Sequence, residues 1–242
     1  MHVRWLTAFL DFPAAEFGSE VTFWRAISGS TVSPPRGPSK EFASLDPFNG
    51  DAHLRVQRIA AGPGGTHLDM HVDDPASAAL EALALGAREI ADYGTHRVMA
   101  SPAGGRFCLV EWAGEHRRSR PIRWPGGTIS IIDQICYDVP AAKFDAELAF
   151  WTALTGQDAP GDVDRHTLTR DPDLSLQVLL VRSDNASGAT YLDVAASNLP
   201  VEVERHEDWG ATVVERRHDQ VVMADPTGRR YFISARNPRT GA

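Results

Sequence analysis

The chain has 242 residues, of which 43% are hydrophobic and 23% are charged, and its formal net charge is -8. These proportions are ordinary for a globular protein and exclude extensive disorder, while the negative balance argues against nucleic-acid binding through phosphate contacts. No apolar run approaches the roughly 20 residues that a membrane span requires, and the chain starts without a signal-peptide pattern, so we expect a cytoplasmic protein with no membrane partner.

The first elements of the chain are a strand and a helix. An apolar run over residues 6–12 predicts a buried strand that ends in a turn at Pro13. The helix that follows ends at Gly29, as helices with a C′ glycine do. Apolar residues at helical spacing form one stripe along it: Phe17, Val21, Trp24 and Ile27.

The remainder of the first half predicts a second round of the same order. Residues 53–59 have strand character, and a further strand is expected over residues 66–72. A helix over residues 75–85 then ends at Gly86. Two closing strands, near residues 97–100 and 107–112, flank a Pro-x-Gly turn.

The second half repeats the first after a linker-like stretch rich in arginine, proline and glycine. Phe9 to Phe17 returns 127 residues later as Cys136 to Phe144, and the later motifs return at a spacing of 124. A repeat of this length indicates a duplicated domain. We therefore predict two domains, at residues 1–113 and 128–242, joined by a linker at residues 114–127.

The two cysteines of the chain, Cys108 and Cys136, lie in apolar runs that resemble strands. Two such residues do not make a disulfide framework, so we expect buried free thiols.

Three motifs carry a resemblance to a known family. They are the Phe-Trp pair in the first helix of each half, the His67-Leu68-Asp69-Met70-His71-Val72-Asp73-Asp74 strand exit, and the Asp225-Pro226-Thr227-Gly228-Arg229-Arg230-Tyr231 turn. Together they resemble the vicinal oxygen chelate superfamily, and more narrowly its glyoxalase-like proteins with two such domains in tandem. The resemblance implies an α+β fold of two glyoxalase/bleomycin resistance/dioxygenase domains, each made of paired βαβββ units that form a curved, cup-shaped mixed sheet. Its members include lyases, dioxygenases, fosfomycin-modifying enzymes and bleomycin-binding proteins, and the fold alone does not choose among them.

The resemblance also implies where a metal would be bound. Catalytic members hold a divalent ion with His, Gln and Glu, and the matching positions in this chain are Thr7, Arg55, His67 and Cys108 in the first copy and Gln134, Gln177, Tyr191 and Phe232 in the second. Arginine does not ligate in practice, Phe232 has no donor atom, and neither copy has a glutamate on its final strand. We therefore expect the metal site of the family to be lost.

One constellation keeps a metal as the alternative. His67, Asp69 and His71 alternate along a strand, so their side chains share one face with neighbours about 7 Å apart. Two imidazoles and a carboxylate suit zinc, iron, nickel or manganese. The second copy has Tyr191, Asp193 and Ala195 at these positions and has lost both imidazoles.

These features favour a protein that binds a small organic molecule in an apolar cup without a metal. The residues expected to line the two cups are His67, Asp69, His71 and Cys108 in the first, and Gln134, Tyr191, Asp193 and Phe232 in the second. Alternatively, the chain is an enzyme, either a metal-dependent lyase or dioxygenase that uses the site around His67 or an isomerase with His67 as general base. A third possibility is an interaction protein with filled cups. Both a monomer with two pseudo-symmetric domains and a homodimer agree with the duplication.

Overall fold

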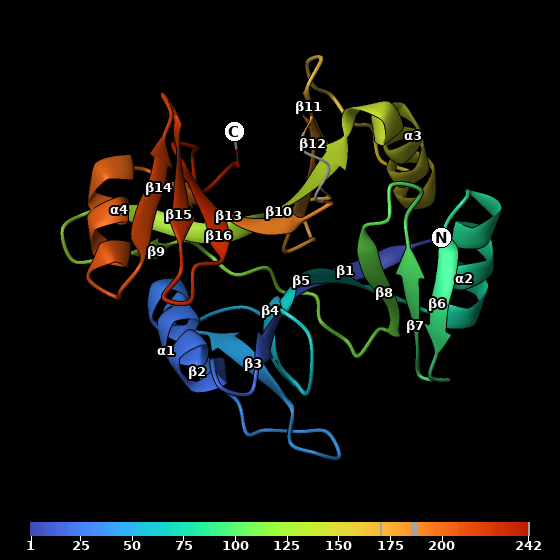
Figure 1. Cartoon of the computed structure of the whole chain (residues 1–242), viewed down its shortest axis with the longest axis horizontal. Coiled ribbons are helices and arrows are strands. Elements are labelled where there is room, and N and C mark those ends of the chain that lie inside the picture. Colours follow the sequence, from blue (N-terminus) through green and yellow to red (C-terminus); the bar gives the residue numbers. More distant parts are fainter. Residues whose placement is uncertain (170, 185–187, 242) are drawn as a thin grey trace. The chain divides into compact units, whose positions relative to one another are not determined.

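The computed structural model describes residues 1–169, 171–184 and 188–241 (Figure 1). Its first half contains β1 (Val3–Pro13), α1 (Phe17–Ser28), β2 (Ser30–Val32), β3 (Phe42–Pro47), β4 (Leu54–Ile59), β5 (Gly65–Val72), α2 (Pro75–Ala84), β6 (Arg88–Asp92), β7 (His96–Ala100) and β8 (Arg106–Glu111). Two rounds of strand, helix and three strands therefore follow each other, as predicted.

The second half follows a similar order after a short strand. It contains β9 (Ile122–Arg123), β10 (Ile129–Pro140), the 3₁₀ turn η1 (Ala141–Lys143), α3 (Phe144–Thr155), β11 (Arg165–Thr167), β12 (Gln177–Ser183), β13 (Thr190–Ala196), α4 (Leu199–Glu207), β14 (Thr212–Arg216), β15 (Gln220–Ala224) and β16 (Arg230–Ser234). Two strands, not three, lie between α3 and β13 in the described part of the chain. Within the described residues, no helix has both the length and the apolar character that crossing a bilayer demands.

Each half forms one mixed sheet, which confirms the α+β prediction. The strand order is β2-β3-β4-β1-β5-β8-β7-β6 in the first and β11-β12-β10-β13-β16-β15-β14 in the second, where β9 also pairs with β10. Asp69 of β5 lies opposite Cys108 of the parallel strand β8. In the same register, Asp193 of β13 lies opposite Phe232 of the parallel strand β16. The duplication thus extends from the motifs to the pairing of the strands.

The helix boundaries follow local chemistry. Gly29 and Gly156 end α1 and α3 in the left-handed conformation, with φ of 62° and 69°, as their positions predicted. The side chain of Asp74 accepts hydrogen bonds from two N–H groups at the start of α2, and that of Asn198 accepts one, from the N–H of Val201, at the start of α4. Both capped helices have a proline in the first turn, where its missing N–H is tolerated.

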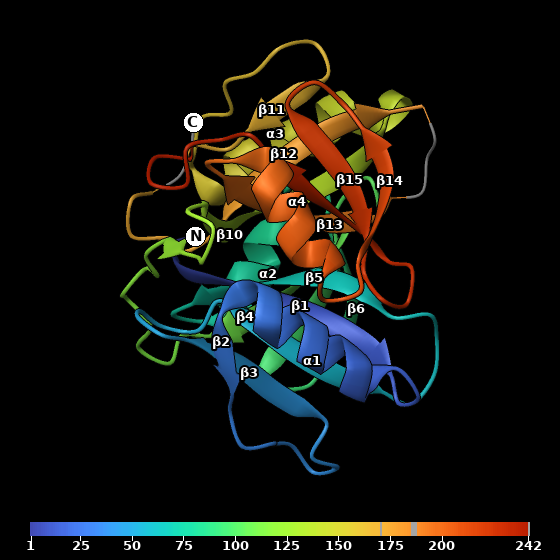
Figure 2. The ribbon, with the colours of Figure 1, turned by 90° about the vertical axis from the view of Figure 1, so that its left-hand side faces the viewer.

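The chain also divides into two compact units that combine segments of both halves. The first comprises residues 1–8, 66–117 and 135–190, and the second comprises residues 9–65, 118–134 and 191–242. In the first unit, the ring of Phe107 on β8 lies 5.4 Å from the ring of Trp151 on α3. In the second, the ring of Trp24 on α1 lies 5.3 Å from that of Tyr231 on β16, and α1 and α4 lie side by side (Figure 2). Trp24 and Trp151 are thus core residues, as predicted.

Candidate functional site

Three polar side chains converge on the first sheet. His67 and Asp69 lie two residues apart on β5 and so point to the same face of the sheet. Cys108 joins them from β8, because the parallel register sets it opposite Asp69. Their donor atoms all lie within 4.8 Å of one another, and Nε2 of His67 is 3.5 Å from Oδ1 of Asp69. We call these three residues the β5–β8 cluster.

The cluster has one accessible member and two buried ones. The side chain of His67 is 18% exposed and that of Asp69 is 7% exposed, while Cys108 is 8% exposed. Burial raises the pKa of the Cys108 thiol; a hydrogen bond with His67 opposes this rise and the charge of Asp69 adds to it. The thiol is therefore neutral at neutral pH, and the edge of the imidazole is the part of the cluster that a ligand reaches first.

His71, the third residue of the predicted facial trio, makes different contacts. Its Nε2 hydrogen-bonds to the hydroxyl of Thr7 on β1 at 2.9 Å, and its Nδ1 lies 3.6 Å from a carboxylate oxygen of Glu115. The imidazole is 1% exposed. The structure thus brings His67 and Asp69 together with Cys108, and gives His71 two polar contacts outside the cluster.

The second sheet has a different surface at the equivalent positions. The rings of Tyr191 and Phe232 meet edge to face with their centroids 5.3 Å apart. Asp193 is fully buried and accepts a hydrogen bond of 2.8 Å from the Ser234 hydroxyl. Gln134, the other predicted residue of this half, is 4% exposed. An aromatic pair therefore stands where the first sheet has an imidazole and a thiol.

The second sheet also supplies its own positive charge to its buried carboxylates. The Arg236 guanidinium lies 3.1 Å from Oδ1 of Asp133 and 3.6 Å from Oδ2 of Asp193. Arg118 approaches the other oxygen of Asp133 at 3.8 Å. Buried carboxylates require such compensation. These arginines provide it from within the chain.

The β5–β8 cluster, by contrast, passes a test of fit for a divalent ion. An imidazole nitrogen, a carboxylate oxygen and a thiol sulfur are ligands of zinc and iron, and three protein ligands are the usual number at a site that keeps a position open. The remaining metal-related positions of the first half contribute nothing to it: Thr7 bonds to His71, and the guanidinium of Arg55 lies 5.9 Å from the ring of Phe9.

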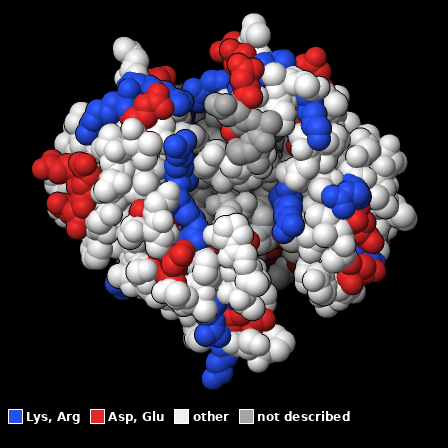
Figure 3. Space-filling model, in the orientation of Figure 1, with Lys and Arg blue, Asp and Glu red and all other residues white. Residues whose placement is uncertain are grey.

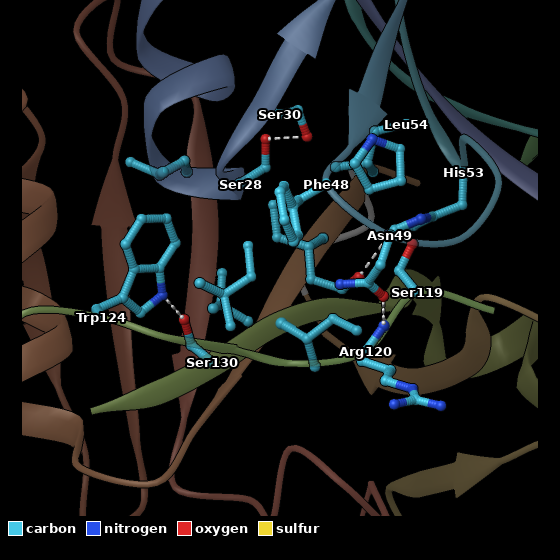
Figure 4. Close-up of a pocket in the computed structure, with 16 residues that line it drawn as sticks. Ser28, Ser30, Phe48, Asn49, His53, Leu54, Ser119, Arg120, Trp124 and Ser130 are labelled. Carbon is cyan, nitrogen blue, oxygen red and sulfur yellow. Dashed lines mark hydrogen bonds between the residues drawn. The ribbon is translucent and has the colours of Figure 1, made fainter. Parts of the chain in front are cut away.

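A small cavity in the second unit lies apart from these residues (Figure 4). It has a volume of about 30 Å³ and is lined by the end of α1, the loop around Phe48 and Asn49, the segment that joins the halves, and β10. Polar contacts close it, among them those from Trp124 Nε1–H to the Ser130 hydroxyl at 2.8 Å and from the Arg120 N–H to Asn49 Oδ1 at 2.7 Å. This volume holds one or two water molecules, which is far less than the several hundred Å³ of a typical ligand pocket.

The first unit has a wider and more open depression. Its volume is about 410 Å³, and its lining comprises residues 1–3, residues 155–158 and Thr169, Asp171, Pro172 and Leu174. None of the residues predicted to bind a ligand lies in it.

The charges on the surface are mixed. On the face shown in Figure 3, positive and negative side chains stand close to one another in several places.

Several buried polar residues were absent from the prediction. Glu20 and Glu147 are fully buried on the first helix of each half, and each accepts a hydrogen bond from the tryptophan one turn later. The repeated Glu-x-x-x-Trp spacing was a signal that could have found them. Asp133 and Arg236 had no such signal, because their pairing depends on the tertiary structure.

Comparison with protein families finds one domain type in both halves. The model of the glyoxalase-like domain matches residues 7–110 and 134–234. A search of curated proteins found no match.

Solved structures share the fold along almost the whole chain. A mutant of 4-hydroxymandelate synthase from Streptomyces coelicolor is 13% identical, with a TM-score of 0.62 over 100% of this chain and 94% of that one. A Mn(II)-bound glyoxalase from Novosphingobium aromaticivorans is 13% identical, with a TM-score of 0.65 over 96% of this chain and 81% of that one. An extradiol ring-cleaving dioxygenase from B. fuscum is 12% identical, with a TM-score of 0.65 over 100% of this chain and 74% of that one. At these identities the likeness shows the fold alone.

Proposed function

Since this chain belongs to the glyoxalase-like domain family, with two tandem domains of the vicinal oxygen chelate fold, we propose that it binds a small organic molecule at the β5–β8 cluster. The observation that carries this proposal is the difference between the two halves. The first half has His67, Asp69 and Cys108 in contact, and the second has an aromatic pair and a carboxylate already engaged by Ser234 and Arg236. Both halves keep the residues that maintain the fold. The small molecule therefore binds to the first half, which retains accessible polar groups.

The chemistry of the cluster indicates the class of ligand. The His67 imidazole is accessible, and its Nε2 lies 3.5 Å from Oδ1 of the more deeply buried Asp69. Such a carboxylate orients the ring. An oxygen-rich ligand, such as a phenol, a catechol or a hydroxy acid, can then accept a hydrogen bond from the ring or donate one to it. The names of the similar structures, a hydroxymandelate synthase and an extradiol dioxygenase, favour the same class of aromatic oxygen compounds.

A pair of matched substitutions tests this proposal. His67 and Tyr191 occupy equivalent positions in the two halves, so His67→Phe and Tyr191→Phe place the same side chain in each. We expect at least one compound from a panel of phenols, catechols and hydroxy acids to raise the Tm of the wild type in the presence of EDTA. The His67→Phe variant should lose this rise and Tyr191→Phe should keep it. A panel without effect, or a rise that survives in His67→Phe, would overturn the proposal.

A divalent metal enzyme is the second candidate, because the three donor atoms of the cluster lie within 4.8 Å of one another. In this case Nε2 of His67, a carboxylate oxygen of Asp69 and the sulfur of Cys108 would hold the ion, and Cys108 would lose its proton on binding. When bound, the ion would polarise an oxygen of the substrate. Asp69 and Cys108, which lie next to His67 in the cluster, would hold its ring in place.

Cobalt(II) distinguishes the two candidates. Thiolate coordination would add an intense charge-transfer band to the absorption spectrum of the Co(II)-loaded wild type, and Cys108→Ser would remove it. The metal candidate also requires stoichiometric zinc, iron, nickel or manganese in protein purified without chelators. Substoichiometric metal and no charge-transfer band would eliminate it and leave the metal-free binding proposal intact.

A further inference from the structure

Two buried carboxyl groups meet in the second unit, between α1 and the turn that joins β15 to β16. Glu20 of α1 is fully buried, and Asp225 in the turn is 3% exposed. One oxygen of each accepts hydrogen bonds from the chain. Oε2 of Glu20 accepts from Trp24 Nε1–H at 3.2 Å, and Oδ1 of Asp225 accepts from the N–H groups of Thr227 at 3.1 Å and Arg229 at 2.8 Å.

The remaining oxygen of each carboxyl group is buried as well. Oε1 of Glu20 and Oδ2 of Asp225 are buried and receive no donor from the described part of the chain, yet the two side chains are in hydrogen-bond contact. Ionised carboxylates only accept hydrogen bonds, so a bond between two of them requires a proton on one. The geometry therefore calls for a carboxylic acid beside a carboxylate.

Among the described residues, the positively charged side chains around the pair are engaged with other groups and do not donate a hydrogen bond to the two unpaired carboxyl oxygens. Arg229 comes nearest from the turn, but its guanidinium bonds to Glu16 at 2.7 Å, to the Pro63 carbonyl at 3.0 Å and to the Thr227 hydroxyl at 3.2 Å. On the other side the pair faces Tyr231 of β16, whose hydroxyl bonds to His206 of α4 at 2.8 Å. His206 in turn contacts Glu202 and Arg205 of the same helix. These α4 side chains are thus engaged with one another and with Tyr231.

The same corner of the first unit has no such pair. Glu147 of α3 is the counterpart of Glu20, and Ser101 in the β7–β8 turn is the counterpart of Asp225. Both oxygens of Glu147 have donors at 2.8 Å, from Trp151 Nε1–H and from the N–H of Ala103. The Ser101 hydroxyl accepts from the N–H of Gly105 at 3.0 Å. Both oxygens of Glu147 therefore already have donors, and the duplication supplies a natural control for the acid pair.

We propose that a proton shared by Glu20 and Asp225 fastens α1 to the β15–β16 turn, and that this corner is a pH-sensitive latch that loosens under alkaline conditions. Burial and then the neighbouring Asp225 raise the pKa of Glu20 from 4.5 to about 8, against the opposing effects of Thr227 and Arg229. Because the native state holds the proton more tightly than the unfolded chain, stability is greatest below pH 4.5 with respect to this group. It declines as the pH rises from 4.5 towards 8.

The test compares Glu20→Gln with Glu147→Gln. The amide that Glu20→Gln introduces can donate to Asp225 without titrating, so this variant should flatten the fall of Tm between about pH 5 and pH 9 and melt above the wild type at the alkaline end. It should also remove about one of the protons that the wild type releases on unfolding, measured by calorimetry in buffers of different ionisation enthalpy. In Glu147→Gln, the NH₂ group of the new side chain would have to face one of the two N–H donors, Trp151 Nε1–H or Ala103 N–H, that now bond to the carboxylate oxygens. This substitution should lower Tm at every pH and keep the wild-type slope.

A second pair of variants keeps the proposal testable if Glu20→Gln does not fold. Asp225→Ser copies the residue of the first unit and should reduce the slope, whereas Ser101→Asp builds a second acid pair beside Glu147 and should steepen it. The proposal is overturned if Glu20→Gln and Asp225→Ser both keep the wild-type slope. It is also overturned if the number of protons released on unfolding is the same in all variants.

Discussion

The carboxylate of Asp69 on β5 stands opposite the thiol of Cys108 on the parallel strand β8. In the second sheet, the same register sets Asp193 opposite Phe232. The two halves therefore have the same backbone pairing and different chemistry at it, and only the first combines a thiol, a carboxylate and an accessible imidazole.

The Cys108 thiol should react slowly with alkylating reagents at neutral pH. Burial raises its pKa, so the reactive thiolate is scarce, and the rate should rise only at pH values above those that activate an ordinary thiol. Iodoacetamide labelling of the native protein across a range of pH, followed by mass spectrometry, measures this. Cys136 is 1% exposed and should label only after unfolding. Labelling of native Cys108 at the rate of a free thiol at neutral pH would contradict the prediction.

Replacing Arg236 by Met should destabilise the protein by about 2–4 kcal/mol, because it removes positive charge from two buried carboxylates. Asp133 and Asp193 lie 3.1 and 3.6 Å from the guanidinium. Urea denaturation measures the change in the free energy of unfolding. Arg239→Met is the control, since Arg239 is exposed on the same terminal segment and its loss should stay within about 0.5 kcal/mol of the wild type. If the two substitutions changed the free energy of unfolding equally, the carboxylates of Asp133 and Asp193 would not depend on the charge of Arg236.

Acid should weaken the second unit through Glu202. Burial opposes its ionisation, but hydrogen bonds from His206 and Arg205 prevail and lower the pKa of Glu202 from 4.5 to about 2. The carboxylate thus contributes stability that is complete above pH 4.5 and lost between pH 4.5 and pH 2. We expect Glu202→Gln to lower the free energy of unfolding by about 2–3 kcal/mol near neutral pH and to reduce its decline in acid. Exposed Glu204 on the same helix provides the control, and Glu204→Gln should leave the acid profile unchanged.

Thr7→Val should separate stability from ligand binding in the first sheet. The substitution keeps the shape of the side chain but removes the hydroxyl that bonds to buried His71 at 2.9 Å, which should reduce the free energy of unfolding by about 1–3 kcal/mol. Because the contacts of His71 with Thr7 and Glu115 lie outside the β5–β8 cluster, ligand-induced shifts in Tm should persist. Loss of those shifts in a folded Thr7→Val protein would assign His71 to the binding site.

Local patterns predicted most of the secondary structure, and the three residues of the cluster were among the four expected to line the first cup. Gly29 and Gly156 end their helices as expected because glycine adopts the left-handed conformation without strain. His67 and Asp69 were expected on one face because side chains alternate along a strand. The same argument added His71, yet it could not indicate that Thr7 on the neighbouring strand would take up that imidazole. Short strands such as β6 and β14 escaped notice because their exposed residues leave no apolar pattern.

The sequence by itself determined the duplication, the α+β class and the approximate positions of the longer helices and strands, because these depend on side-chain periodicity and turn chemistry within a few residues. Only the tertiary structure decided that Cys108 rather than His71 lies close to both His67 and Asp69, that Arg236 neutralises Asp133, and that Glu20 meets Asp225. Each of these contacts joins residues far apart in the chain. Its free energy depends on burial and on the register of paired strands, which no local pattern specifies.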